Sequence, residues 1–168
     1  HKARLVKQGH KEDKEFEIFS STQNPTETQA FCAAILGVPS NRVVVRTRRL
    51  GGGFGGKETR PVAFAAVMAL AAKKAGRPVR CMLDRDEDMW YSGQRHPFKA
   101  TWKIGYNKDG KLQRVEASVY NNGGWSQDLS QAVLERSMTH IDNCCFIPNV
   151  RVQGFICKTN TMVSPFFV

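Results

Sequence analysis

A glycine-rich run between a short β-branched stretch and an apolar segment constrains this chain more than any other feature. Residues 51–56 read GGGFGG, directly after the strand-like residues 43–49, and Pro61 then opens an alanine-rich segment that Gly76 ends. Glycine lets the backbone approach a ligand closely, and N–H groups at a strand-to-helix junction bind anions. The sequence therefore predicts a strand, a glycine loop and a helix over 62–74 in direct succession.

Two common phosphate-binding patterns fit this loop incompletely. Gly51, Gly53 and Gly56 match a dinucleotide fingerprint, but the preceding strand is basic and the third glycine does not open the helix. Gly56 followed by Lys57 also matches a P-loop, yet Glu58 stands where a hydroxyl would hold Mg²⁺. A plain connecting turn remains open as an alternative. Phe54 favours a ligand site, because a bulky ring among glycines gains little in a solvent-exposed loop.

The rest of the chain predicts an α+β fold, a mixed β-sheet with helices packed on it. Asn24, Pro25 and Glu27 predict a helix start, and the alternating residues 98–104 and 112–120 predict a hairpin. We expect a turn over 121–124, a helix capped by Asp128 that reaches about residue 140, and a last strand over 149–157.

Composition narrows the class of partner. The 168 residues carry 25 Lys and Arg against 15 Asp and Glu, a net charge of +10 that suits anionic partners. No apolar run reaches membrane-spanning length, and the five cysteines form no C-x-x-C pair, which favours free thiols in a reducing compartment. A non-catalytic nucleic-acid-binding module stays possible from charge alone, but scattered Lys and Arg and the lack of an RNP-like motif disfavour it.

The run GGGFGGKETR over residues 51–60 closely resembles the molybdenum-cofactor segment of the xanthine dehydrogenase and xanthine oxidase family. Further ordered matches extend this resemblance from about residue 16 to residue 160; they include STQNP at 21–25, VRCMLDR at 79–85, GQRHPF at 93–98, DLS at 128–130, ER at 135–136 and KTN at 158–160. It implies that residues 1–168 are part of a molybdopterin-binding domain. Residues 161–168 depart from the family and are expected to be a divergent or truncated end.

The resemblance implies a role for five positions. Gln23 is expected to hydrogen-bond an oxo ligand of molybdenum, and Phe54 with Gly55 to line the pterin and the metal, with no direct protein ligand to molybdenum. Glu58 and Arg136 are expected to bind the substrate. The general-base glutamate of the family lies outside this chain, so no catalytic residue is assigned.

The implied function is oxidation of hypoxanthine and xanthine to urate with oxygen from water, electrons passing to 2Fe-2S clusters and FAD and then to NAD or oxygen. The parent is expected to be a cytoplasmic or peroxisomal homodimer with no membrane or nucleic-acid partner. The chain needs the remainder of the parent polypeptide, and we expect it to be inactive alone. An aldehyde oxidase of the same family is the alternative enzyme; the pair of Glu58 and Arg136 favours a purine.

Plainer interpretations of these residues stay open. Glu58 and Arg136 could be exposed charges or members of a surface salt bridge, which contributes about 0–1 kcal/mol. Arg46, Arg48 and Arg49 could form a solvated strand face or lie beside an anionic cofactor. Ser130 has no evident base in the sequence, which leaves nucleophilic hydrolysis unsupported.

Overall fold

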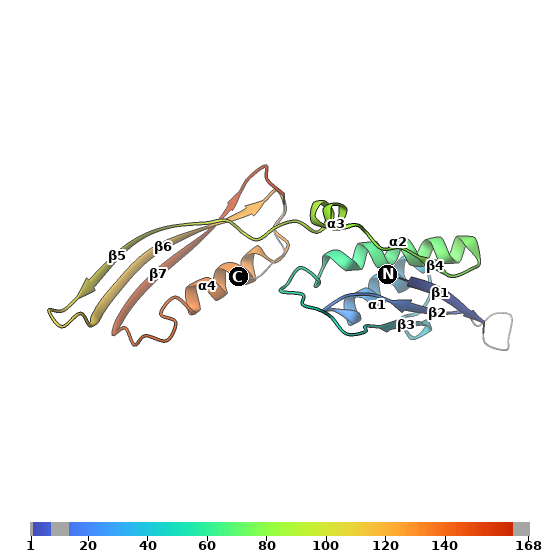
Figure 1. Ribbon diagram of the computed structural model, residues 1–168, viewed down its shortest axis with the longest axis horizontal. Coiled ribbons are helices and arrows are strands. Elements are labelled where there is room, and N and C mark those ends of the chain that lie inside the picture. The colour runs from blue at the N-terminus through green and yellow to red at the C-terminus, as the bar shows by residue number, and fades with distance from the viewer. Residues whose placement is uncertain (1, 8–13, 163–168) are drawn as a thin grey trace. The chain divides into compact units, whose positions relative to one another are not determined.

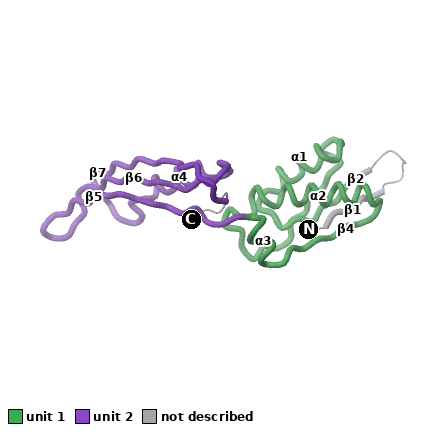
Figure 2. The backbone as a smooth tube through the Cα atoms, turned by 90° about the horizontal axis from the view of Figure 1, so that it is seen from above, with its two compact units in different colours: residues 1–92 green, residues 93–168 purple. Residues whose placement is uncertain are grey.

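The computed structural model describes residues 2–7 and 14–162, with side chains from residue 15 onward. The expected divergent end falls mostly on residues 163–168, outside the described residues. The chain forms two compact units, residues 1–92 and 93–168 (Figure 2). The α+β class is confirmed, in the form of two mixed sheets, one in each unit.

Unit 1 is a four-stranded sheet with helices packed on it (Figure 1). Its strands, in the spatial order β3-β2-β1-β4, pair antiparallel except for the parallel pair β2–β3. The strands are β1 (Lys2–Lys7), β2 (Lys14–Phe19), β3 (Val43–Arg46) and β4 (Val79–Arg80); the helices are α1 (Pro25–Leu36), η1 (Ser40–Arg42), α2 (Arg60–Ala75) and α3 (Arg85–Ser92).

The predicted starts of the two long helices are confirmed, and both helices contribute to one core with the sheet. Asn24 caps α1 by accepting from the Glu27 N–H at 3.1 Å. Alanines on α2 let that helix approach the sheet closely, and Lys73 donates to the carbonyl of Leu36 at 2.6 Å, which satisfies the end of α1. The core of unit 1 consists of Phe16, Ile18, Cys32, Ala33, Leu36, Val43, Ala65, Ala66, Ala69 and Ala72.

Unit 2 is a three-stranded sheet, in the order β5-β6-β7, with one helix on one face (Figure 1). Its elements are β5 (Phe98–Tyr106), β6 (Leu112–Gly124), α4 (Ser130–Thr139) and β7 (Asn149–Lys158). Strand β6 pairs antiparallel with β5 and parallel with β7. Leu134 of α4 packs on Ala117 and Val119, and Gly154 lies directly beneath Leu134 and Met138.

Two local predictions in unit 2 are wrong. The expected turn over 121–124 is strand, because Asn121 pairs with Phe98 and donates its amide to the Ser130 carbonyl at 3.0 Å. Asp128 does not cap the helix: α4 begins at Ser130 after Leu129, with no side-chain cap. Strand β1, the two-residue strand β4 and helix α3 have no counterpart among the elements predicted above. Within the described residues, no helix is both long and apolar enough to cross a bilayer.

Candidate molybdopterin site

The glycine loop holds the side chain of Gln23 in one orientation. Oε1 of Gln23 accepts from the backbone N–H groups of Gly55 at 3.1 Å and Lys57 at 3.2 Å. The backbone N–H of Gln23 donates to the Lys57 carbonyl at 2.7 Å. Two donors on one amide oxygen fix which end of the amide is which. Nε2 of Gln23 is therefore the end that can donate to a ligand.

Residues on either side of Gln23 support the same arrangement. Buried Thr22 donates its hydroxyl to the Lys57 carbonyl at 3.1 Å and accepts from the Asn24 N–H at 3.0 Å. The turn before α1 is therefore tied to the loop more than 30 residues later. Sequence reasoning missed the role of Thr22, because nothing in STQNP indicates that it pairs with the glycine loop.

Two loop glycines are required by close approach. A Cβ on Gly53 would lie 2.8 Å from Cγ of Gln23 and closer still to Cδ and Oε1, so only glycine leaves room for that side chain. A Cβ on Gly52 would lie 2.6 Å from the Phe54 ring, and Gly52 has φ +133°. The glycines thus leave room for two specific side chains.

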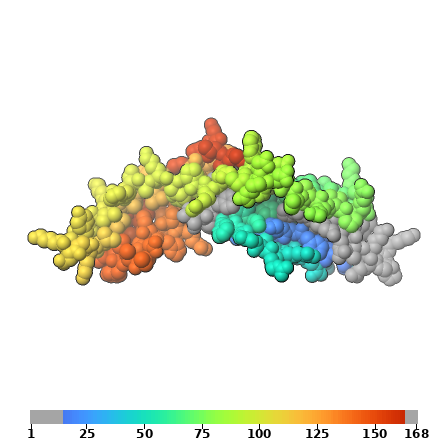
Figure 3. Space-filling view, viewed as in Figure 1, coloured from blue at the N-terminus to red at the C-terminus, as the bar shows by residue number. Residues whose placement is uncertain are grey.

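Phe54 and Gly55 lie at the centre of the loop, where Phe54 is exposed and Gly55 is buried. Both have positive φ, 50° and 80°, and the turns on either side are closed by Gly56 N–H to the Gly53 carbonyl and Glu58 N–H to the Gly55 carbonyl. Positive φ is uncommon for a bulky residue. The Phe54 ring is 76% exposed, and the segment around residue 50 lies at the surface of unit 1 (Figure 3). An exposed ring on a constrained loop is suited to contact a ligand.

Glu58 lies half-buried where the loop enters α2. The first turn of α2 is held by Tyr91 of α3, whose hydroxyl donates to the Arg60 carbonyl at 3.3 Å and whose ring packs edge-on against Phe64. Burial raises the pKa of Tyr91, and nearby Arg60 partly opposes that shift, so the phenol stays protonated and can donate. The contacts of Tyr91 therefore hold in place the start of α2, which directly follows Glu58.

Arg136 lies in unit 2, in the last turn of α4, with its side chain exposed. A cation there interacts favourably with the helix dipole. Among the residues that the structure describes, Arg136 makes no ion pair. Gln23, Phe54, Gly55 and Glu58 are brought together in unit 1, whereas the predicted pairing of Glu58 with Arg136 joins two units and stays a prediction.

A serine and a histidine meet in the interior of unit 2. Nε2 of His96 lies 2.8 Å from Oγ of Ser130, and their exposures are only 5% and 0%. No pattern in the sequence indicates this partner for Ser130. Because both groups are buried and fix the start of α4, the pair is structural, and nucleophilic hydrolysis remains unsupported.

Two basic residues, one at the end of β3 and one just after it, have partners within unit 1. Nε of Arg46 lies 2.6 Å from Oε1 of Glu17, and the guanidinium of Arg48 lies 5.6 Å from the centre of the Phe19 ring. An ion pair and a cation–π contact give these two arginines a structural role. Glu17 offsets the charge of Arg46, so part of the basic character that suggested an anionic ligand is paired within unit 1.

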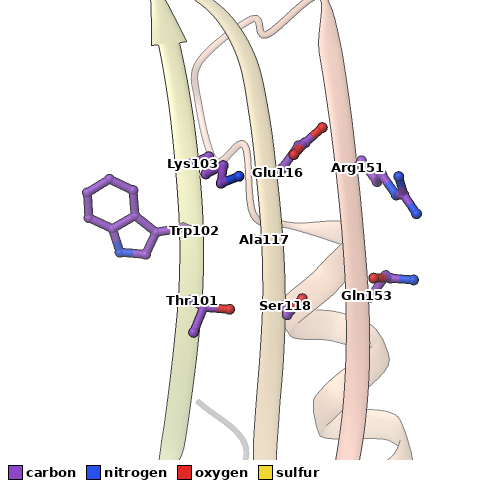
Figure 4. Close-up of a pocket in the computed structure, with 8 residues that line it drawn as sticks. All are labelled: Thr101, Trp102, Lys103, Glu116, Ala117, Ser118, Arg151 and Gln153. Atoms are coloured by element: carbon purple, nitrogen blue, oxygen red, sulfur yellow. The ribbon is translucent and has the colours of Figure 1, made fainter.

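A shallow hollow of about 300 Å³ lies on the sheet of unit 2. Thr101, Lys103, Ser118 and Gln153 project into it, while Trp102 points away from them (Figure 4). None of the five predicted site residues lines it. This hollow is therefore separate from the glycine loop.

The loop geometry fits a molybdenum–pterin group. An oxo ligand accepts hydrogen bonds, and Nε2 of Gln23 is a donor on a fixed amide. The loop glycines let a pterin approach the backbone closely, and the exposed Phe54 ring offers it an apolar contact.

The chain also matches the family model of the molybdopterin cofactor-binding domain over residues 4–167. It therefore belongs to the molybdopterin cofactor-binding domain family, as the sequence analysis expected.

Within this family the chain matches a segment of xanthine dehydrogenase-type molybdenum hydroxylases. It is 60% identical over 156 residues to the xanthine dehydrogenase of Emericella nidulans, and 60% identical over 156 residues to the xanthine dehydrogenase/oxidase of Gallus gallus. Each match covers 93% of this chain but only 11% and 12% of the relative. A nicotinate hydroxylase of Emericella nidulans is 55% identical over 158 residues, 94% of this chain and 12% of that protein.

Solved structures agree on the fold. The aldehyde oxidoreductase of Desulfovibrio desulfuricans superposes with a TM-score of 0.80 at 22% identity, over 99% of this chain and 18% of that chain. Quinoline 2-oxidoreductase of Pseudomonas putida superposes with a TM-score of 0.74 at 21% identity, over 99% of this chain and 21% of that chain. At such identities these likenesses show the fold alone.

Proposed function

We propose that this chain forms the part of a purine hydroxylase that binds molybdopterin and one edge of the substrate. The observation that carries the proposal is the fixed amide of Gln23, whose Oε1 accepts from Gly55 and Lys57 and whose Nε2 is left to donate. The 60% identity to two xanthine-oxidising relatives supports the choice of reaction class. The parent oxidises hypoxanthine and xanthine to urate.

The cofactor, when bound, supplies the two-electron oxidation and the transfer of oxygen derived from water. Gln23 orients it by donating from Nε2, and the backbone at Phe54 and Gly55 lines it. Because Gln23 is held by backbone groups, it needs little reorganisation when the cofactor binds.

Glu58 and Arg136 bind the purine. Glu58 accepts a hydrogen bond from a ring N–H, or donates one when protonated. Oxidation at the imidazole carbon drives negative charge onto the six-membered ring, and the permanently charged guanidinium of Arg136 stabilises that charge.

Other parts of the reaction belong to the parent polypeptide. It supplies the general base, the 2Fe-2S clusters, FAD and the site for NAD or oxygen, and it forms a homodimer. The chain spans about a tenth of the relatives that it matches. On its own the chain is inactive. The purified chain should therefore form no urate from xanthine.

A nicotinate hydroxylase is the second candidate, because one such relative is 55% identical over nearly the whole chain. Nicotinate carries a carboxylate, which an exposed arginine such as Arg136 suits, whereas Glu58 would repel it. An aldehyde oxidase needs neither contact. A substitution at Glu58 should therefore affect the turnover of a purine, of nicotinate and of an aldehyde differently.

The test uses a chimera in which residues 16–160 replace the matching segment of the Emericella nidulans xanthine dehydrogenase. Glu58→Val should lower kcat/KM for xanthine on the order of 100-fold, because a polar substrate edge is left unpaired, while aldehyde turnover changes little. Glu135→Val, a change of the same type at an exposed site on α4, should leave both unchanged. Equal losses on both substrates, or a gain on nicotinate with no loss on xanthine, would overturn the purine assignment.

A further inference from the structure

Two adjacent cysteines lie in the connection between α4 and β7. Cys144 and Cys145 are both exposed and free. They lie in the second of two successive turns: the Asn143 N–H donates to the His140 carbonyl at 3.0 Å, and the Cys145 N–H donates to the Asp142 carbonyl at 2.9 Å. Neither thiol is needed for the packing of unit 2.

The other three thiols differ from this pair in burial and spacing. Cys32 is fully buried, and its burial raises its pKa to about 11, which suppresses the reactive thiolate. Cys81 and Cys157 are half-buried, and neither is adjacent in sequence to another cysteine. Only Cys144 and Cys145 combine exposure with an adjacent thiol among the described residues.

Covalent geometry limits what this pair can bind. The described chain has no cis peptide bond, so the two Cα atoms are about 3.8 Å apart. A disulfide usually joins Cα atoms about 4.4–6.8 Å apart, so a direct S–S bond between these neighbours is strained. One atom inserted between the two sulfurs lengthens the bridge and relieves that strain.

The number of protein ligands that an atom requires limits which element can bridge the two sulfurs. Structural zinc requires about four protein ligands, and the described residues hold no group of three or more His, Cys, Asp or Glu side chains that could bind a metal ion. A monoorganic trivalent arsenical needs only two thiolates. Its arsenic is soft and bonds strongly to sulfur, as thiolate ligands prefer.

We propose that Cys144 and Cys145 form a two-thiol binding site for trivalent organoarsenicals. With the hydrated acid R–As(OH)₂, two As–O bonds break, two As–S bonds form, the thiol protons leave with the two hydroxyls as water, and arsenic stays trivalent. No oxidant or reductant is consumed. The site lies outside the residues proposed to bind cofactor and substrate.

The experiment treats the reduced full-length chain with one equivalent of phenylarsine oxide and measures the intact mass. We expect one phenylarsenic group per chain, linked to residues 144–145 in peptide mass spectra. An added 1,2-dithiol should remove it, whereas a monothiol at the same thiol concentration should not, since chelation by two sulfurs resists single-thiol exchange.

Cys144→Ser and Cys145→Ser should each abolish the monothiol-resistant adduct. Cys81→Ser and Cys157→Ser serve as matched controls and should keep it. Circular dichroism checks that all four variants fold, which is expected for the first two because their side chains are exposed. An adduct that survives in Cys144→Ser, maps elsewhere, is lost to a monothiol, or never forms on the wild-type chain would overturn the proposal.

Discussion

The contact between Gly53 and Gln23 gives a prediction whose sign depends on a second residue. In Gly53→Ala the new Cβ would overlap the Gln23 side chain, which must then leave its place. The hydrogen bonds to Oε1 from Gly55 and Lys57 are lost with it. At about 1 kcal/mol each they contribute about 2 kcal/mol, against a gain of about 0.4–1 kcal/mol from the less flexible unfolded chain. Gly53→Ala should therefore lower the free energy of unfolding by about 1–2 kcal/mol.

In a Gln23→Ala background the overlap is gone. Gly53→Ala should then be neutral or stabilise the chain by about 0.4–1 kcal/mol, because the backbone of Gly53 lies outside the left-handed region. Urea unfolding followed by circular dichroism gives the four free energies of this double-mutant cycle. Hydrogen exchange at the Gly55 and Lys57 amides reports the lost bonds locally. The same cost of Gly53→Ala in both backgrounds would refute the reasoning.

Two further predictions concern the cores of the two units. Gly154→Ala should lower the stability of unit 2 by about 1–3 kcal/mol, because its Cβ would lie within 3.0 Å of Leu134. Gly105→Ala is the control, since its Cβ would make an ordinary contact at 3.8 Å. Similar shifts of the melting temperature for both variants would contradict this packing. Because burial raises the pKa of Cys32 from 9.0 to about 11, the folded chain keeps a proton that the unfolded chain loses, so stability should fall by about 2 kcal/mol between pH 9 and pH 11. Urea titrations should show a flatter dependence in Cys32→Ala, and an unchanged slope would argue against a buried thiol.

The sequence predicted the elements whose signals are local. Asn24 and Glu27 mark the start of α1, and Gly76 marks the end of α2 in the left-handed conformation. The turn predicted over residues 121–124 was wrong because tertiary hydrogen bonds outweigh local propensity. The side-chain amide of Asn121 donates to the Ser130 carbonyl inside the core. Strand β1 is only six residues long, and although residues 2–5 alternate polar and apolar, so short a charged stretch does not predict a strand by itself.

The identities of the site residues come from the family resemblance and stay predictions, whereas their geometry comes from the structure. The resemblance selected Gln23, Phe54 and Glu58, and the structure brings these three into one loop region of unit 1. No pattern could show that the loop backbone fixes the Gln23 amide, because that contact joins residues more than 30 positions apart. The pairing of Glu58 with Arg136 joins two units and remains a prediction.

The most direct test of the proposed role of Gln23 is urate formation by the chimera carrying residues 16–160, measured together with its molybdenum content. We predict stoichiometric molybdenum and turnover of xanthine. Gln23→Ala should lower turnover of xanthine and aldehydes alike, because Gln23 contacts the cofactor and Glu58 the purine. A folded chimera that binds molybdenum but forms no urate, or a Gln23→Ala chimera with full turnover, would contradict the account.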